Sequence, residues 1–313
     1  MKILLVNKYL YRKGGAETYF IKLGEYLKSL GNEVEYFGMA DERNCVGNRV
    51  EAYTENIDFH KKSLKHITYP FKIIYSVNAR KQIRKVLSNF KPDVVHLNNF
   101  NYQLTPSIIY EIKKHNIPIV YTAHDVQLVC PNHKLKNDYT DGLCRKCDGG
   151  KYFECVKNNC VHSSKIRSIL GAVEAWYYKL RHTYKMIDLT VCPSEFMEKE
   201  ISRNDDINGR TVTMYNFIDE IKPLGAECEN YVLYFGRYSE EKGISNLVKA
   251  TKKLSNIPFV FAGKGELENE VNSADNIKNV GFKTGDELRN IIEKALFTVL
   301  PAEWSENLSL IHI

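Results

Sequence analysis

Two cations in a strand–turn–helix segment are the residues best suited to do chemistry. Arg237 and Lys242 flank a short acidic turn within 231–243, YVLYFGRYSEEKG. The apolar run 231–235 is typical of a buried strand, and Gly243 begins a helical pattern. Cations at the carboxyl end of a parallel strand suit a diphosphate, because the next helix adds N–H groups and a positive dipole. The alternative is a pair of solvated surface charges.

A thiol-rich insertion, 130–160, holds the second group of reactive residues. Four of its cysteines form two close pairs, which predict a tetrahedral structural zinc site. A cysteine and a histidine just before them could replace one of the pairs as zinc ligands. The competing interpretation is that the cysteines bind no metal and are reduced, partly buried thiols. No catalytic metal is expected, because no water-activating group is suggested nearby. In chain order these residues are Cys130, His133, Cys144, Cys147, Cys155 and Cys160.

Strand and helix patterns alternate along both halves of the chain. Such βα alternation implies parallel sheets covered by helices, so we predict an α/β fold with two Rossmann-like domains. The first half predicts strands at 2–6, 33–37, 93–97, 117–121, 189–192 and 212–215. The second half predicts strands at 232–235, 259–262, 277–280 and 297–300. Helices are expected at 16–30, 106–115, 164–184, 244–254, 266–273 and 284–295.

Length and composition set the wider limits. The 313 residues suffice for two ordinary domains, and we place them at 1–217 and 231–313 with a linker at 218–230. No apolar run reaches about 18 residues, and the N-terminus reads as a strand rather than a signal peptide. Eight cysteines without a signal indicate a reducing compartment, so we expect a cytoplasmic protein.

Six short motifs occur in a specific order and spacing. With them the chain resembles the retaining glycosyltransferases of family 4, which have the GT-B fold, and especially the branch that builds capsular and other surface polysaccharides. The motifs are Gly14-Gly15-Ala16-Glu17, His124-Asp125, Pro193-Ser194, Gly236-Arg237 with Glu241-Lys242-Gly243, Gly263-Lys264-Gly265-Glu266, and PAEWSEN at 301–307.

The resemblance implies transfer of a sugar, with retention, from a UDP- or GDP-linked donor to a lipid-linked or saccharide acceptor. The second unit would then be the donor domain and the first the acceptor domain. Arg237 and Lys242 would hold the donor diphosphate and stabilise the leaving nucleotide. Fixed cations lower this barrier because negative charge grows in the transition state. They also remove the need for a divalent metal.

The other motif residues receive roles from the resemblance alone. His124 would reach the transferred sugar, and Glu306 would contact donor sugar hydroxyls. The glycines form two groups: backbone at the first group would approach the donor phosphates, and the second group would shape the nucleotide pocket. Each has a plainer interpretation: a satisfied loop histidine, an exposed glutamate, or ordinary turns. The glycines are Gly14 and Gly15 at the phosphates, and Gly236, Gly263 and Gly265 at the nucleotide.

The C-terminal end departs from the family pattern. The second acid of the Glu-x7-Glu motif that starts at Glu306 would fall at position 314, after the last of the 313 residues. Residues 308–313, LSLIHI, match the translation of a transposon-type sequencing adapter. We therefore expect that the natural gene continues differently and that the donor domain is incomplete. Codons unrelated to that adapter would contradict this expectation.

The segment 59–92 contains nine Lys and Arg and no Asp or Glu, in a chain of net charge +6. Aromatic and aliphatic residues lie among the cations. This pattern favours docking on an anionic membrane surface, as suits an enzyme with a lipid-linked acceptor. A solvated helix face is the competing interpretation. Nucleic acid is not expected as a partner, because no recognition module accompanies the charge.

Two other functions are compatible with the same fold. One is a nucleotide-sugar 2-epimerase, which lacks the Glu-x7-Glu region. The other is a non-catalytic module that binds a polysaccharide precursor or a partner protein through the cysteine loop. Arg237, Lys242 and Glu306 favour sugar transfer over both. UDP or GDP should stabilise either enzyme against heat but not the non-catalytic module.

Overall fold

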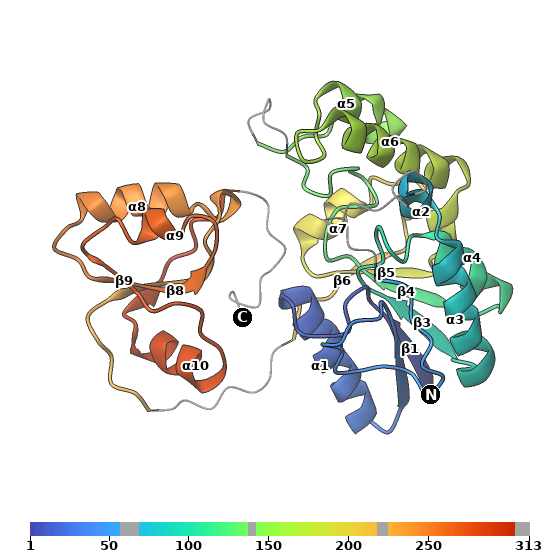
Figure 1. Cartoon of the computed structure of the whole chain (residues 1–313), viewed down its shortest axis with the longest axis horizontal. Helices are drawn as coiled ribbons and strands as arrows, with labels where there is room; N and C mark the ends of the chain where they lie inside the picture. Colours follow the sequence, from blue (N-terminus) through green and yellow to red (C-terminus); the bar gives the residue numbers. More distant parts are fainter. Residues whose placement is uncertain (57–68, 137–141, 218–224, 304–313) are drawn as a thin grey trace. The chain divides into compact units, whose positions relative to one another are not determined.

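The computed structural model describes residues 1–56, 69–136, 142–217 and 225–303. The chain divides into two compact units, the first ending at Phe217 and the second spanning 218–306 (Figure 1). Each unit is an open α/β sheet. Among the described residues, no helix combines the length and the apolar composition needed to cross a bilayer.

The first unit is built on a six-stranded sheet with the order β2-β1-β3-β4-β5-β6. Every neighbouring pair is parallel, so all carboxyl ends lie at one edge. The strands are β1 (Lys2–Val6), β2 (Glu33–Phe37), β3 (Val94–Leu97), β4 (Ile119–Thr122), β5 (Leu189–Cys192) and β6 (Thr211–Thr213).

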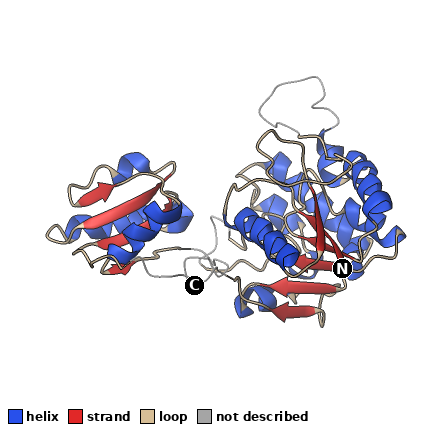
Figure 2. Ribbon diagram, turned by 90° about the horizontal axis from the view of Figure 1, so that it is seen from below, coloured by secondary structure: helices blue, strands red, loops and turns tan. Residues whose placement is uncertain are grey.

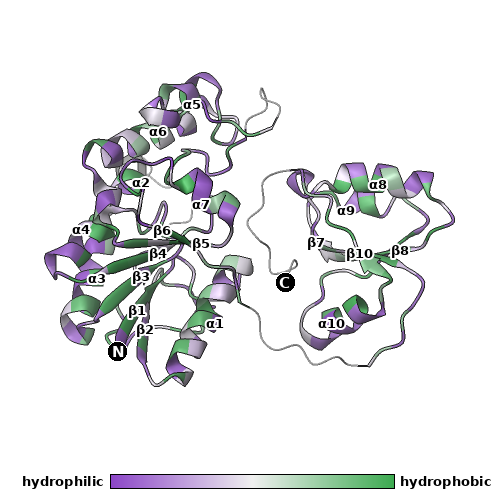
Figure 3. Ribbon diagram, turned by 180° about the vertical axis from the view of Figure 1, so that it is seen from behind, coloured by the Kyte–Doolittle hydropathy of each residue, from purple (hydrophilic) through white to green (hydrophobic). Residues whose placement is uncertain are grey.

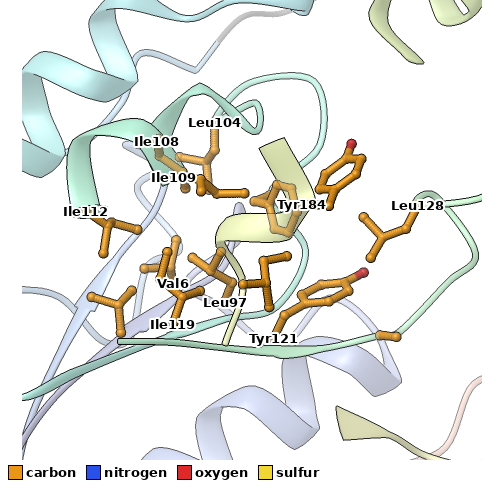
Figure 4. Close-up of a cluster of buried hydrophobic side chains, with 14 of the residues drawn as sticks. Val6, Leu97, Leu104, Ile108, Ile109, Ile112, Ile119, Tyr121, Leu128 and Tyr184 are labelled. Atoms are coloured by element: carbon orange, nitrogen blue, oxygen red, sulfur yellow. The ribbon is translucent and has the colours of Figure 1, made fainter. Parts of the chain in front are cut away.

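Helices cover both faces of this sheet (Figure 2). Alternate side chains of β1 enter two separate cores: Leu4 and Val6 on one face, Ile3 and Leu5 on the other. The larger core also takes residues from β3, β4 and the helix 107–114 (Figure 4). The helices are α1 (Gly15–Ser29), α2 (Tyr69–Ile74), α3 (Val77–Phe90), α4 (Ser107–Lys114), α5 (Phe153–Lys157), α6 (Lys165–Leu180) and α7 (Glu195–Ile201), with short 3₁₀ turns η2 (Asp148–Gly150) and η3 (Thr183–Met186).

The second unit repeats the design with a parallel sheet in the order β10-β7-β8-β9. Hydrophobic strands run through the middle of each unit (Figure 3). Val232 and Tyr234 face one core, and Tyr231 and Leu233 face the other. The elements are β7 (Val232–Arg237), η4 (Glu240–Lys242), α8 (Ile244–Lys253), β8 (Phe259–Lys264), α9 (Glu268–Val271), β9 (Ile277–Asn279), α10 (Gly285–Lys294) and β10 (Phe297–Thr298).

The predicted α/β class and parallel sheets are confirmed, and each predicted strand is present. Two helix predictions were too long. The expected helix 164–184 ends at Leu180, because His182 adopts a left-handed conformation with φ 46°. The expected helix 266–273 is reduced to α9, with four residues. The helices α2 and α3 lie in the basic segment, of which 57–68 falls outside the described residues.

The basic segment is partly neutralised by an acid that lies outside it. Glu111 of α4 is buried, with 2% of its side chain exposed. Arg84 Nε lies 2.6 Å from Glu111 Oε1, and Arg80 Nη2 lies 2.8 Å from Oε2. Hydrogen bonds from Arg84, and then from Arg80, outweigh the cost of burial and lower the pKa of Glu111 to about 2. Two of the nine cations therefore join α3 to α4.

Replacing Glu111 with Gln should destabilise the first unit by about 3 kcal/mol at pH 7, because two guanidinium groups lose their counter-charge. The carboxylate's contribution is complete above its unfolded pKa of 4.5 and is lost as pH falls toward 2. The difference between variant and wild type, measured by urea unfolding, should thus shrink below pH 4.5. Glu42→Gln, at an exposed acid, is the matched control. Equal stabilities of Glu111→Gln and wild type at pH 7 would contradict the pairing.

Candidate functional site

Three neighbouring strands of the first unit end level with one another. Val6 of β1 pairs with Leu97 of β3, and Leu97 pairs with Tyr121 of β4. Polar residues follow each strand at this edge. They are Asn7 and Lys8 after β1, Asn98 after β3, and His124 and Asp125 after β4. Ligands of open α/β sheets bind beyond the carboxyl ends of the strands.

His124 is held at this edge by Asn98 and Tyr19. Its Nε2 lies 2.8 Å from Oδ1 of the buried Asn98, so Nε2 carries the proton and Nδ1 is an acceptor. The ring of Tyr19, from α1, meets the imidazole edge-on at 5.3 Å. Burial lowers the pKa of His124 to about 4. The imidazole is therefore neutral near pH 7 and suited to hydrogen bonding with a hydroxyl group.

A polar network beside His124 was not predicted from the sequence. Lys8 Nζ donates to Asn101 Oδ1 at 2.9 Å, and Asn101 Nδ2 lies 3.1 Å from His133 Nδ1. His133 Nδ1 also lies 3.4 Å from Asp125 Oδ2. Burial raises the pKa of Asp125. His133, together with the backbone N–H of Gln127 and the charge of Lys8, lowers this pKa by a larger amount, so the net shift is downward. The position of Lys8 directly after a strand was the one sequence signal for this network.

The glycine pair after β1 is not required by the protein's own packing. Gly14 is extended, with φ −161°, and Gly15 starts α1. A Cβ at Gly15 would meet nothing within 4 Å, and a Cβ at Gly14 would meet only the flexible end of Glu17, at 3.3 Å. The described protein atoms leave this helix start open, as the predicted approach to donor phosphates requires. That role stays a prediction.

In the second unit, Arg237 is the last residue of β7, and Lys242 is the last residue of η4, the turn that follows. The Arg237 side chain is 71% exposed, and its Nη1 lies 3.7 Å from Glu241 Oε1. Gly243 follows in a left-handed conformation with φ 71°, and α8 starts at Ile244. This matches the predicted strand, turn and helix, and it leaves the guanidinium accessible from solvent.

Close backbone packing explains the glycines at the ends of β7 and β8. A Cβ at Gly263 would overlap the carbonyl oxygen of Gly236, and a Cβ at Gly265 would overlap that of Tyr238. Gly236 itself has φ 148°, which favours glycine. These positions are therefore more than ordinary turns. Their predicted contact with a nucleotide remains a prediction, because packing alone accounts for them.

The segment after β10 packs against η4. Glu303 N donates to Glu241 O at 3.2 Å, and Asn246 donates to the Glu303 carboxylate. Pro301 lies so close to Gly243 that a side chain there would overlap it. Glu306, the predicted sugar-binding acid, lies outside the described residues. The chain leading toward it nevertheless passes beside the turn that carries Lys242.

The structure does not bring the predicted alternative ligand pair, Cys130 and His133, to one place, because the two side chains have different neighbours. Cys130 lines a small cavity together with Cys144, Cys147, Cys155 and Cys160. His133 instead contacts Asp125 and Asn101, and its ring stacks on Tyr102 at 5.5 Å. His133 has a left-handed backbone conformation, with φ 62°, and its side chain points away from that of Cys130.

Comparison with known proteins identifies the family. Residues 13–221 match Glycosyltransferase Family 4, and residues 217–313 match Glycosyl transferases group 1. The chain belongs to glycosyltransferase family 4. It is thus a glycosyltransferase with two Rossmann-like domains.

Two curated relatives of this glycosyltransferase align along most of its length. An uncharacterized 42.6 kDa protein in the cps region of Klebsiella pneumoniae is 25% identical, over 98% of this chain and 80% of the relative. The uncharacterized glycosyltransferase MJ1178 of Methanocaldococcus jannaschii is 20% identical, over 100% of this chain and 75% of the relative. Neither similarity indicates a particular sugar.

Solved structures support the GT-B fold. Sucrose-phosphate synthase from Thermosynechococcus elongatus has a TM-score of 0.62 at 15% identity, covering 99% of this chain and 77% of that one. HepE from Anabaena in complex with UDP has a TM-score of 0.61 at 15% identity, with the same coverage. The lipopolysaccharide outer core galactosyltransferase WaaB has a TM-score of 0.58 at 13% identity, covering 96% and 74%.

The low pKa of His124 predicts a pH-dependent loss of stability. Between pH 6.5, its value in the unfolded chain, and pH 4, the unfolded chain binds a proton that the folded chain does not. Relative to His124→Gln, the wild type should therefore lose up to about 3 kcal/mol as pH falls from 7 to 4. Denaturant unfolding at several pH values measures this difference.

Other titrating groups cancel in this comparison because both chains contain them. The main ones are His96, whose pKa burial lowers to about 4, and Glu174, whose pKa burial raises to about 7 and which acts in the opposite direction. His115→Gln, at an exposed histidine that ends α4, is the control and should show no such trend. A constant difference between His124→Gln and wild type across pH 4 to 7 would show that His124 is not buried in its neutral form.

Proposed function

We propose that this glycosyltransferase moves a sugar, with retention, from a UDP- or GDP-linked donor to a lipid-linked or saccharide acceptor in the assembly of a bacterial surface polysaccharide. The observation that carries the proposal is the placement of Arg237 as the last residue of β7 and of Lys242 as the last residue of η4, just before α8. Two relatives agree with it by their descriptions: a protein in a cps region and a lipopolysaccharide galactosyltransferase. Structures of HepE contain UDP and glucose.

The proposed chemistry in the second unit is stabilisation of a leaving nucleoside diphosphate. As the sugar–phosphate bond breaks, negative charge develops on the diphosphate. The Arg237 guanidinium can bind two of its oxygens in a fork, and the Lys242 ammonium adds a second charge. Backbone N–H groups at the start of α8 lie in the same segment. These cations supply the charge that a divalent metal would otherwise provide, so we propose a metal-independent reaction.

The proposed role of the first unit is to contact the transferred sugar and to leave room for the donor phosphates. His124 is neutral, and its imidazole can accept a hydrogen bond from a hydroxyl of the transferred sugar. Lys8 and Asp125, which belong to the network beside it, add one charge of each sign. Gly14 and Gly15 leave open the start of α1, where a donor phosphate could approach backbone N–H groups. Glu306 is proposed to contact donor sugar hydroxyls.

Replacing Arg237 or Lys242 with Ala should lower kcat/KM about a hundredfold or more, because each change removes a charge that acts on the leaving group. The assay is release of UDP or GDP from a panel of nucleotide sugars by the purified protein. Lys249→Ala, at an exposed lysine of α8, is the control and should retain wild-type activity. Unchanged turnover in the double variant, or an epimerised nucleotide sugar as the product, would contradict the proposal.

We further propose that the enzyme docks on an anionic membrane surface, where a lipid-linked acceptor would reside. Supporting this, α6 exposes an apolar seam at heptad-like spacing, and its last turn contains Lys179. The seam comprises Ile166 (73% exposed), Ile169 (42%), Val173 (40%), Trp176 (36%) and Leu180 (80%). In the basic segment, Lys72, Lys81, Lys85 and Lys91 remain exposed, whereas Arg80 and Arg84 bind Glu111. Interfacial helices combine these two features.

The double variant Ile166→Gln with Leu180→Gln should reduce co-sedimentation with vesicles containing anionic lipid, because it removes the two most exposed side chains of the seam. Lys81→Glu with Lys85→Glu should reduce it further at low salt. Leu30→Gln, at another exposed apolar residue of the same unit, is the control. Equal binding to neutral and anionic vesicles by the wild type would refute the docking.

A further inference from the structure

Five cysteines of the insertion 130–160 line one small cavity of the first unit. Cys130 lies in the loop after β4, two others precede η2, one lies in α5 and the last follows α5. The wall also includes three charged residues, Lys136, Arg145 and Asp148. The set is Cys130, Cys144, Cys147, Cys155 and Cys160, and none of the five forms a disulfide.

The loop after Cys130 folds back over its sulfur. Cys130 Sγ donates to Asn132 Oδ1 at 2.9 Å, and Lys134 N donates to the same oxygen at 2.9 Å. His133 and Leu135 adopt left-handed conformations, with φ 62° and 49°, which non-glycine residues rarely adopt. This loop therefore fixes the position of Cys130 at the cavity.

The other thiols are close enough to Cys130 and to one another to interact. Cys155 and Cys160 are hydrogen-bonded to each other. Cys147 interacts electrostatically with all four remaining thiols. The shared cavity therefore holds enough sulfur atoms to surround a single metal ion.

We propose that four of these five thiols bind one zinc ion, with Cys130 and Cys147 among the ligands. Four S–H bonds lose their protons to solvent and four Zn–S bonds form, with no oxidation or reduction. Zinc closes structural sites with four thiolates in a tetrahedron. Lys136 at the cavity wall would offset part of the resulting charge of −2, whereas Arg145 is paired with Glu200.

Binding requires the thiols to turn toward a common centre. In the described part of the chain, no three His, Cys, Asp or Glu side chains are already arranged around a metal position. Rotation about the short Cys side chains inside the shared cavity can supply this arrangement. The segment 137–141 lies outside the described residues and takes no part in the site.

The metal would act as a structural clip rather than in the reaction. It would tie the loop after β4 to α5 and to the turn before η2. His133, three residues after Cys130, contacts Asp125 at the carboxyl edge of the sheet. A metal that holds Cys130 in place would therefore also hold the part of the loop that positions His133.

The test is the zinc content of the full chain, purified under reducing conditions without a chelator and measured by elemental mass spectrometry. One zinc per chain is expected. Cys130→Ser and Cys147→Ser should lose it, whereas Cys45→Ser, at an exposed cysteine of the same unit, should keep it. No zinc in the wild type, iron with sulfide in its place, or full zinc content in either cluster variant would overturn the proposal.

A second measurement covers variants that fail to fold. The wild-type protein is stripped of metal and titrated with Co²⁺. Intense thiolate-to-cobalt absorption with tetrahedral d–d bands, saturating at one equivalent and displaced by Zn²⁺, is the expected result. Zinc should also raise the Tm of the stripped protein, because binding to the folded state alone stabilises it. Absence of the thiolate band would overturn the proposal.

Discussion

The direct backbone contact between β7 and β8 is the constraint on which the second unit depends. The strands stay in register to their last residues, where Gly236 pairs with Gly263 and Arg237 with Lys264. Any side chain at Gly263 would overlap the Gly236 carbonyl group. The chain therefore leaves the sheet at Arg237, turns through η4 and starts α8. Packing of backbone thus fixes where β7 ends and where the turn that carries the two cations begins.

The candidate-site residues of the two units differ in burial and in charge. In the first unit, burial makes His124 neutral, while nearby His133 keeps the pKa of Asp125 low. In the second unit, the Arg237 guanidinium stays largely exposed. A buried neutral imidazole suits hydroxyl groups, and an exposed guanidinium suits a diphosphate. The proposed reaction needs both, because its donor joins a neutral sugar to a charged leaving group.

Patterns local in sequence were predictable, and contacts between distant loops were not. Apolar runs located the strands, because a strand buried on both faces must be apolar throughout its length. The network of Lys8, Asn101, His133 and Asp125 was missed, because it depends on left-handed turns at non-glycine residues such as His133. Likewise, the pairing of Arg84 with Glu111 joins residues 27 positions apart. Composition of the basic segment alone gave no sign of it.

The glycines show a third kind of limit. Sequence motifs located Gly236, Gly263 and Gly265, but a motif does not reveal whether a ligand or a neighbouring strand excludes the side chain. Here the neighbouring backbone does so. At Gly15 no neighbouring atom does, and this contrast makes the start of α1 the stronger candidate for close approach by a ligand.

The central claim is that cations at the end of β7 bind a diphosphate. Calorimetric titration of the protein with UDP and uridine, and with GDP and guanosine, tests it most directly, since the members of each pair differ only in the diphosphate. Two charge-assisted contacts should make one nucleoside diphosphate bind about a hundredfold more tightly than its nucleoside, with an advantage that weakens as salt increases. Equal affinities of diphosphate and nucleoside in both pairs would contradict the claim.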